Sequence, residues 1–405
     1  MISSFAWQNV WRNKIRSAVI ITAVALGTFA GIFTIAFTNG MVNDRIRVII
    51  RTELSHIQIH QPGFVDNNDF TIRMSNADSI LKKIKKLPHV MAAGKRIVIN
   101  SMVASAETST GVKITGIDPA DGIKVSDLNS KLINGKFLEE TGKNPVVIGE
   151  KLATKLKIGL RNKVVITVQD VNKNIVAGAF RVAGIFRTDN LMFDESTIFV
   201  RNSDLVKLTG LGPGEAHEIA VLLDNNELSE KTRNTISAMF PRLDVKDWQK
   251  LSPEAGYLVS AMGQYMFIFI IIIMLALCFG IINTMLMVVL ERVHELGMLM
   301  AIGMDKIKVF TMIVLETVYL SLTGGALGIA LGYGASTYFA RNGIDLYFWK
   351  EAYAEIGYSS IVYPVIDAFT MVYTSVMVVL MGIISALYPA YKALRLNPTQ
   401  AIQTE

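Results

Sequence analysis

Four stretches of the sequence contain no charged side chain, and each is long enough to cross a membrane as a helix. These are residues 17–43, 255–290, 317–340 and 368–391. About 20 residues span a hydrocarbon core of about 30 Å, and an Asp or Lys at its centre costs about 2.5–3.5 kcal/mol. Soluble helices of this length show a polar face, which these stretches lack. We therefore predict a membrane protein with four transmembrane α-helices, one near the N-terminus and three toward the C-terminus.

The segment between the first two predicted spans contains about 210 mostly polar residues. Strands are expected at 96–105 and 111–117, with short helices and a later β-hairpin around them. This mixture predicts a large α+β extracytoplasmic domain inserted between spans one and two. Because a hairpin-rich stretch interrupts it, we predict two subdomains: residues 44–135 with 215–250, and an inserted part at about 136–214.

The predicted boundaries follow from these stretches. Phe5, Trp7 and Trp11 lie beside basic residues, which suits either a helix on the inner membrane face or a simple aromatic and basic flank. The expected order is a basic amphipathic helix at 1–16, a span at 17–43, the external domain at 44–254, a stalk and span at 255–290, a loop at 291–308, a span at 309–340, a loop at 341–367, a span at 368–391 and a tail at 392–405.

Basic residues predict the orientation, because short cytoplasmic loops are enriched in Lys and Arg. Such residues precede the first span, occupy the 291–308 loop and follow the fourth span, whereas the 341–367 loop holds only Arg341 and Lys350. We expect both termini and the 291–308 loop in the cytoplasm, with the large domain outside. The first apolar run exceeds the 7–15 residues typical of a signal peptide, which favours an uncleaved anchor.

Composition excludes several classes of site. The net charge of +6 is explained by basic loops facing anionic lipid, so membrane lipids are expected as partners and nucleic acid is not. The single cysteine, Cys278, lies in the second predicted span, so neither a disulfide nor a cysteine-based metal site is expected. The histidines show no zinc-site spacing. No metal site and no catalytic residue are predicted.

The segment from Glu291 to Met304 is short and mixed in polarity, with Leu296 and Met300 among its apolar residues. A short helix held between two spans would move both of them when it moves. Such a helix could pass the motion of a cytoplasmic partner through the membrane. The alternative interpretation is a solvated turn.

This segment resembles the coupling segment of the MacB/FtsX-type ABC permeases, whose pattern is E-R-x-x-E-[IL]-G-x-L-x-A-[IL]-G. The N-terminal WQNVWRNKIRS and the C-terminal YPAYKALRLNPTQAI, with Leu396, Pro398 and Ala401, also resemble that family. Met300 stands where the family commonly has Arg or Lys. The resemblance predicts these ATPase-coupling residues: Glu291, Arg292, Glu295, Leu296, Gly297, Met300, Ala301, Gly303 and Met304.

The resemblance implies that two permease chains, identical or homologous, stand on a dimer of separate ABC ATPases in the bacterial inner membrane, with the large domain periplasmic. No GxxxxGK[ST] motif is present, so this chain is not expected to be an enzyme. No cofactor is expected on it, because ATP and magnesium would bind the ATPase.

A permease of this length resembles the lipoprotein-releasing (LolC/LolE) group, which implies lipoprotein or other lipophilic cargo and a possible periplasmic carrier or adaptor. The hairpin tip at 170–178 is shorter and more polar than the carrier-recruiting hook of one member of that group. An apolar cargo-facing lining is predicted where spans one and two meet, with the alternative, favoured for each residue taken singly, that it faces lipid or packs against other helices. It comprises Phe33, Phe37, Met41, Met262, Met266 and Ile270.

Two alternative functions stay open: export of a peptide or small molecule with a periplasmic adaptor, and FtsX-like mechanical regulation of a cell-wall hydrolase without transport. In span three, Glu316 is expected to have a structural role near the inner surface. Small-residue spacing predicts close helix packing, within the permease or against a second one, at Gly324, Gly325, Gly328 and Gly332.

Overall fold

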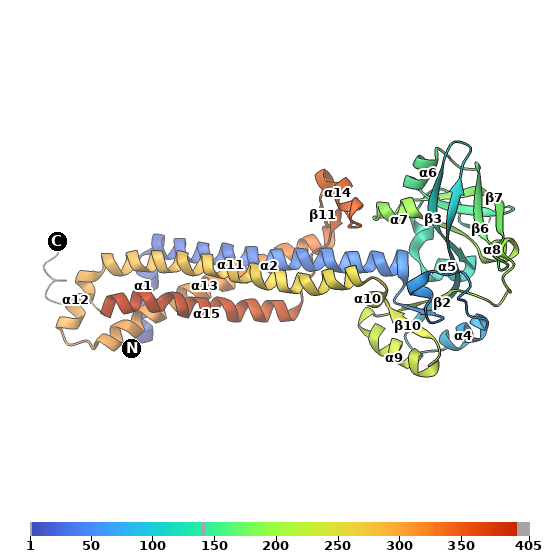
Figure 1. The fold of residues 1–405 in the computed structure, drawn as a ribbon. Helices are drawn as coiled ribbons and strands as arrows, with labels where there is room; N and C mark the ends of the chain where they lie inside the picture. Colours follow the sequence, from blue (N-terminus) through green and yellow to red (C-terminus); the bar gives the residue numbers. More distant parts are fainter. Residues whose placement is uncertain (1, 139–141, 395–405) are drawn as a thin grey trace. The chain divides into compact units, whose positions relative to one another are not determined.

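The computed structural model describes residues 2–138 and 142–394. The predicted tail beyond residue 394, with the family-like Leu396, Pro398 and Ala401, lies outside the described residues. The chain separates into two compact units (Figure 1). We call them the helical unit, which comprises the chain up to Val42, Ser260–Asp345 and the chain from Ile361, and the mixed unit, which comprises Asn43–Val259 and Leu346–Ser360.

The helical unit is built around four long apolar helices, which confirms the four predicted membrane helices. Each runs beyond its charge-free stretch, because a helix can continue past the hydrocarbon core. Two shorter helices and a two-stranded antiparallel ribbon complete the unit. The long helices are α2 (Lys14–Val48), α11 (Pro253–Glu291), α13 (Lys306–Asn342) and α15 (Ala368–Leu394); the other elements are α1 (Ile2–Arg12), α12 (Val293–Ala301), β11 (Ile344–Asp345) and β12 (Ile361–Val362).

Glycines on α13 allow α2 and α15 to approach closely. A Cβ at Gly324 would lie 2.8 Å from the Ile21 carbonyl oxygen of α2, and one at Gly328 would lie 2.6 Å from the Ala25 oxygen. A Cβ at Gly332 would lie 3.0 Å from Ile32, also on α2, whereas Gly325 faces Val378 of α15. The structure thus places the predicted packing glycines at contacts within one chain.

The described strands of the mixed unit form one 10-stranded sheet, in the order β10-β1-β9-β2-β3-β8-β5-β7-β4, with β6 paired to β2 and β7. Most neighbours are antiparallel, but β3 with β8 and β5 with β7 are parallel. The strands are β1 (Ile57–His60), β2 (Val90–Ala104), β3 (Ser109–Ile117), β4 (Leu132–Gly135), β5 (Pro145–Gly149), β6 (Lys163–Gln169), β7 (Ile175–Phe186), β8 (Thr197–Arg201), β9 (Glu218–Leu223) and β10 (Asp244–Asp247).

Helices cover this sheet, which confirms the predicted α+β class, and Figure 1 shows α9 beside β10 and α8 beside β6 and β7. The helices of the unit are α3 (Phe64–Asn67), α4 (Ala77–Ile84), α5 (Pro119–Val125), α6 (Glu150–Leu156), α7 (Leu191–Ser196), α8 (Asn202–Thr209), α9 (Ser229–Met239), α10 (Trp248–Leu251) and α14 (Lys350–Glu355). The unit also contains a π-helical segment that continues α2, η1 (Ile49–Leu54), and three short 3-10 segments, η2 (Asp127–Lys131), η4 (Asn226–Leu228) and η5 (Tyr347–Trp349).

The predicted division of the external domain into two subdomains is not confirmed. One apolar core does belong to the first predicted part alone, with Ile57 and Val245 among its members. A second core, however, joins Ile99 and Val112 of the first part to Val146 of the predicted insertion. Because the hydrogen-bonded sheet also runs through both parts, the two do not fold around separate cores.

Candidate functional site

The N-terminal segment forms a helix packed on the third long helix. Ala6 and Val10 of α1 are fully buried, and the Trp7 ring meets Tyr319 of α13 edge-to-face with centroids 5.5 Å apart. Phe5 and Trp11 stay exposed. The apolar spacing of α1 therefore serves a protein contact on one side and leaves aromatic side chains on the other.

The loop between α11 and α13 is short and contains a helix of its own. Helix α11 ends at Glu291, and Arg292 breaks the helical path with φ −102° and ψ 13°. After α12, Gly303 has φ +104°, which a residue with a Cβ adopts only with strain. The Asp305 side chain then accepts from the backbone N–H of Ile307 and caps α13. Two sharp breaks thus make α12 a separate element joined closely to two long helices.

Six charged side chains meet where α1, α2, α11, α12 and α13 come together, and we call them the charge cluster. Arg12 donates to Glu295 at 2.6 Å, and Arg16 pairs with Glu291. Arg292 bonds to Glu295 at 3.0 Å and to Glu316 at 3.3 Å. With three cations and three anions, the cluster is neutral overall. It surrounds a small cavity of about 270 Å³.

Burial differs strongly across the charge cluster. Glu316 is 6% exposed, so it depends on Arg292 to compensate its lost hydration. Glu295 lies nearer the surface, and its hydrogen bond from Arg12, together with the nearby charge of Arg292, lowers its pKa below the usual value. The pairs Arg12–Glu295 and Arg16–Glu291 are partly exposed, so water and salt weaken their attraction. The Arg292–Glu316 pair is more deeply buried and fixes α12 to α13.

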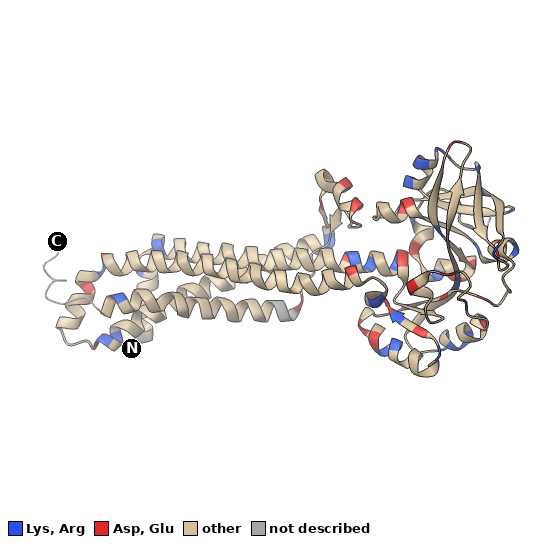
Figure 2. Ribbon diagram, viewed as in Figure 1, with Lys and Arg blue, Asp and Glu red and all other residues tan. Residues whose placement is uncertain are grey.

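The structure divides the predicted coupling residues between an inner and an outer side of the α12 region. Leu296 and Gly297 are buried, and Met300 and Met304 pack on the apolar cluster of the long helices. Ala301 and Gly303 are exposed, as are the neighbouring side chains of Met298, which is 44% exposed, and Ile302, which is 85% exposed. Figure 2 shows charged residues near α12, whereas the middle parts of the long helices carry none.

The six residues of the predicted cargo lining are not gathered into one described cavity. Met266 and Ile270 of α11 pack into the apolar cluster that also contains Ile35 of α2. Phe33 instead stacks on Phe29 and meets Phe339 of α13 at 5.9 Å between centroids. Phe37, Met41 and Met262 are half-buried. Their role toward cargo stays a prediction.

The sequence interpretation missed the charge cluster, although it named several of its members. Arg12 and Arg16 were explained as residues that orient the chain, and Glu291 and Glu295 as parts of a motif. The sequence feature that could have indicated the cluster is that its three arginines are matched by three glutamates in or beside neighbouring predicted spans. That feature predicts pairing between spans without saying which residues pair.

Comparison with known proteins supports a family assignment. A sequence model of the MacB-like periplasmic core domain matches residues 17–239, and one of the FtsX-like permease C-terminal region matches residues 267–398. The chain is 23% identical to the lipoprotein-releasing system transmembrane protein LolC of Neisseria meningitidis, over 96% of this chain and 94% of that protein. It is 25% identical to an ABC transporter permease of Methanocaldococcus jannaschii, and that match covers 100% of this chain and 98% of that protein.

A third relative matches over a shorter region. The macrolide export ATP-binding/permease protein MacB of Escherichia coli is 29% identical over 56% of this chain, but the match covers only 34% of that protein.

Proposed function

Because the chain belongs to the family of ABC transporter permeases that join a MacB-like periplasmic core domain to an FtsX-like permease region, we propose that it transmits the motion of a separate ATPase to its mixed unit. In this proposal α12 is the cytoplasmic coupling helix. The mixed unit then lies outside the membrane, and both termini lie in the cytoplasm, as the distribution of basic residues indicates.

The observation that carries this proposal is the way α12 is held. It has nine residues and is connected by short breaks to two long apolar helices. The charge cluster also joins it to α1 through Arg12 and to α13 through Arg292. A force applied to α12 therefore reaches three other helices without passing through a flexible linker.

The ATPase is proposed to dock on the exposed side of α12. Met298 and Ile302 present apolar surface there, next to Ala301 and Gly303. An exposed Ile beside small residues suits an apolar pocket on a partner. The partner would bind ATP and magnesium, and a second permease chain would complete the transporter.

Lipoprotein release is the cargo assignment that we propose. It is supported by the similarity to LolC, which extends over 96% of this chain. Export with a periplasmic adaptor is the second candidate, supported by the higher identity to the macrolide exporter within a shorter region. FtsX-like regulation of a wall hydrolase is the third, supported by the match of the C-terminal region.

Affinity purification of the full chain in mild detergent, with mass spectrometry of bound proteins and acylated peptides, tests the assignment. Co-purification of an ATPase with acylated lipoproteins is the expected result. An ATPase with an adaptor or wall hydrolase, and without acylated cargo, would contradict lipoprotein release and leave coupling through α12 intact. Absence of any ATPase would contradict the coupling role itself.

A pair of variants tests the docking surface. Ile302→Glu places a charge on the exposed end of the α12 region and is expected to reduce ATPase recovery at least about tenfold, because burying an unpaired charge at an interface is costly. Ile175→Glu changes an equally exposed Ile, 82% exposed, at the start of β7 and is expected to leave recovery unchanged. Equal recovery with both variants would exclude Ile302 from the interface.

A further inference from the structure

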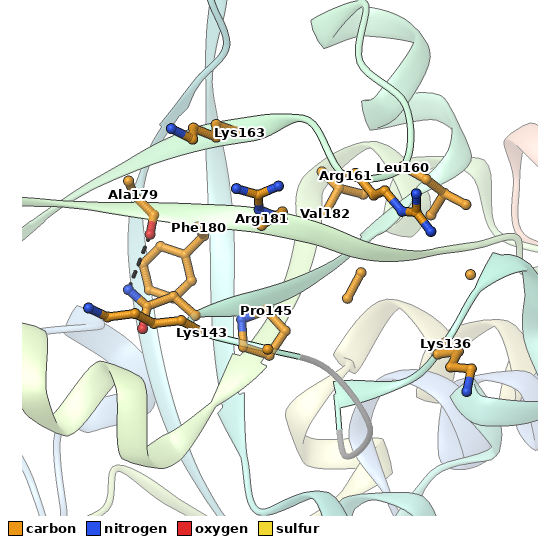
Figure 3. A pocket seen from close by; sticks show the side chains of 14 residues that line it. Lys136, Lys143, Pro145, Leu160, Arg161, Lys163, Ala179, Phe180, Arg181 and Val182 are labelled. Atoms are coloured by element: carbon orange, nitrogen blue, oxygen red, sulfur yellow. Dashed lines mark hydrogen bonds between the residues drawn. The ribbon is translucent and has the colours of Figure 1, made fainter.

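A broad groove opens on the mixed unit beside β5, β6 and β7. Its volume is about 910 Å³, within the range of small-molecule pockets in proteins. Figure 3 shows side chains from separate segments around it: Lys143 before β5, Arg161 before β6, Lys163 on β6 and Arg181 on β7. Segments far apart in sequence therefore contribute to one surface.

The described lining of this groove is strongly basic. It contains five cationic side chains and, among the residues that the structure describes, no carboxylate. Four of these cations have no ion-pair partner among the described residues: Lys143, Arg161, Lys163 and Arg181. This set we call the basic quartet; the fifth cation is Lys136.

The two arginines of the basic quartet differ from most other described arginines of the mixed unit, which form ion pairs, whereas lysines without a described ion pair also occur elsewhere in the unit. Lys155 bonds to Glu195 at 2.6 Å, and Arg201 bonds to Asp204 at 2.8 Å. Arg187, which follows the groove residue Ala183 closely in sequence, pairs with Glu150. Two arginines without a described carboxylate partner on one groove therefore distinguish it from the rest of the unit.

Strand register increases the repulsion within the basic quartet. Lys163 of β6 is the direct antiparallel partner of Arg181 of β7. Side chains at directly opposed positions lie on the same face, with Cβ atoms about 4.5–5.5 Å apart, and like charges there are destabilising. An anion between the two side chains would convert that repulsion into attraction.

The floor of the groove is apolar and held in place. Phe180 and Val182 are buried beneath it, and Leu160 is 40% exposed at its edge. The Arg161 backbone N–H donates to the Val182 oxygen at 2.8 Å, and the Asn144 amide donates to the Ala179 oxygen at 3.2 Å (Figure 3). The two loops that carry Lys143 and Arg161 are thus fixed to β7.

We propose that this groove binds a phosphate-bearing ligand whose adjoining apolar part rests on Leu160. Two guanidinium groups match phosphate oxygens with paired hydrogen bonds, and two lysines add charge. The phosphate belongs either to a lipid headgroup or to a soluble phosphorylated compound. This inference is independent of coupling through α12, because every residue involved lies in the mixed unit.

Calorimetric titration of the purified full chain in a neutral detergent tests the proposal with two probes. Pyrophosphate represents a soluble source, and dihexanoylphosphatidylglycerol represents a headgroup. Saturable binding of either probe is expected, and the tighter one identifies the source. Arg161→Gln/Arg181→Gln is expected to weaken binding at least about tenfold, because charge-assisted bonds are lost. Binding of neither probe by the unaltered chain would overturn the proposal.

A matched control removes two positive charges elsewhere in the same unit. Lys151→Gln/Lys207→Gln changes exposed lysines on α6 and α8 that line no part of the groove. This variant is expected to bind like the parent. Equal weakening by both double variants would overturn the proposal, because it would show nonspecific attraction to net charge.

Thermal unfolding without ligand separates a binding defect from misfolding. Lys163→Gln removes one of two opposed like charges, so it is expected to raise the unfolding midpoint at low salt while weakening probe binding. A lowered midpoint together with lost binding would indicate structural damage and would contradict the repulsion on which the proposal rests.

Discussion

His56 is a buried histidine whose ring accepts a backbone hydrogen bond. Its Nδ1 accepts from the Leu223 N–H at 3.0 Å. Burial, and next the charge of Arg51, lower its pKa from 6.5 to about 4. Below pH 6.5, therefore, His56 becomes protonated in the unfolded chain, whereas in the folded chain it stays neutral until the pH falls to about 4. The stability contributed by neutral His56 is complete above pH 6.5 and is lost as pH falls toward 4.

We expect the free energy of unfolding to decrease by about 3 kcal/mol as pH falls from 6.5 to 4, because of this one residue. His56→Asn keeps an acceptor for the Leu223 N–H but cannot titrate, so its unfolding midpoint should fall less between pH 7 and pH 4.5. Thermal unfolding of the full chain measures this. An unchanged pH dependence of the midpoint in His56→Asn would refute the assignment.

Arg292 and Glu316 form a second residue-scale test, because their environments are unequal. Glu316 has Arg292 as its nearest described cation, at 3.3 Å, whereas Arg292 also bonds to Glu295. Arg292→Gln is expected to cost about 3–5 kcal/mol, because it leaves Glu316 buried without a partner. Glu316→Gln should cost less, and the double variant should be more stable than Arg292→Gln alone.

Thermal unfolding of the four proteins in one detergent gives this double-mutant cycle. Additive losses would show that the two side chains do not interact and that the charge cluster does not fix α12 to α13. The isolated surface pair of Lys157 and Glu107 at 2.9 Å provides the control, because exposed pairs contribute about 0–1 kcal/mol.

At the scale of elements, contact between α2 and α13 depends on the absence of side chains at single positions. A Cβ at Gly328 would lie 2.6 Å from the Ala25 oxygen and from the Thr28 Cβ, so the helices must separate to accept it. Gly328→Ala is expected to lower the stability of the helical unit by about 1–3 kcal/mol.

Gly334 on the same helix supplies the matched control for this prediction. A Cβ there meets nothing within 4 Å, so Gly334→Ala should not lower stability and, through the higher helix propensity of Ala, should raise it by up to about 1 kcal/mol. Unfolding midpoints of both variants in the same detergent decide the matter. If the two substitutions had equal effects, intrinsic helix propensity rather than packing would explain the result.

The same elements show how far sequence reasoning reaches. The four membrane helices were predictable because a missing charge is a local property, yet α2 continues to Val48, past Asp44 and Arg45, because charge marks the hydrocarbon edge and not the helix end. The single sheet was not predictable, because β3 pairs with β8 and β5 with β8 across long loops. Local pattern identifies strands but carries no information on such pairing.

The charge cluster illustrates the same limit within the candidate site. Arg12 and Glu295 are 283 residues apart in sequence. Both occur in motifs that the sequence analysis singled out, but only the packing of α1 and α12 into the apolar cluster of the long helices brings them together. Residue types at the site were therefore predictable, whereas the contacts that join them were not.

At the scale of the whole molecule, the proposed coupling depends on the shortness of the connection between α12 and α13. Only residues 302–305 separate them, and Gly303 and Asp305 define its path. Insertion of Gly-Gly-Ser after Met304 would loosen the chain connection between α12 and α13, since such linkers are flexible, and would leave the Arg292–Glu316 pair as a remaining link. The ATPase should still co-purify, because the exposed side of α12 is unchanged.

In reconstituted vesicles with the co-purified ATPase, this insertion is expected to weaken cargo-dependent stimulation of ATP hydrolysis, because one of the links of α12 to the long helices is loosened, while basal hydrolysis persists. The same insertion after Asn172, in the exposed turn between β6 and β7, should preserve stimulation, because that turn joins strands within the mixed unit. Stimulation at the parent level after the insertion at Met304 would mean that motion does not depend on the connection between α12 and α13, and coupling through that connection would then be rejected even though the family assignment stands.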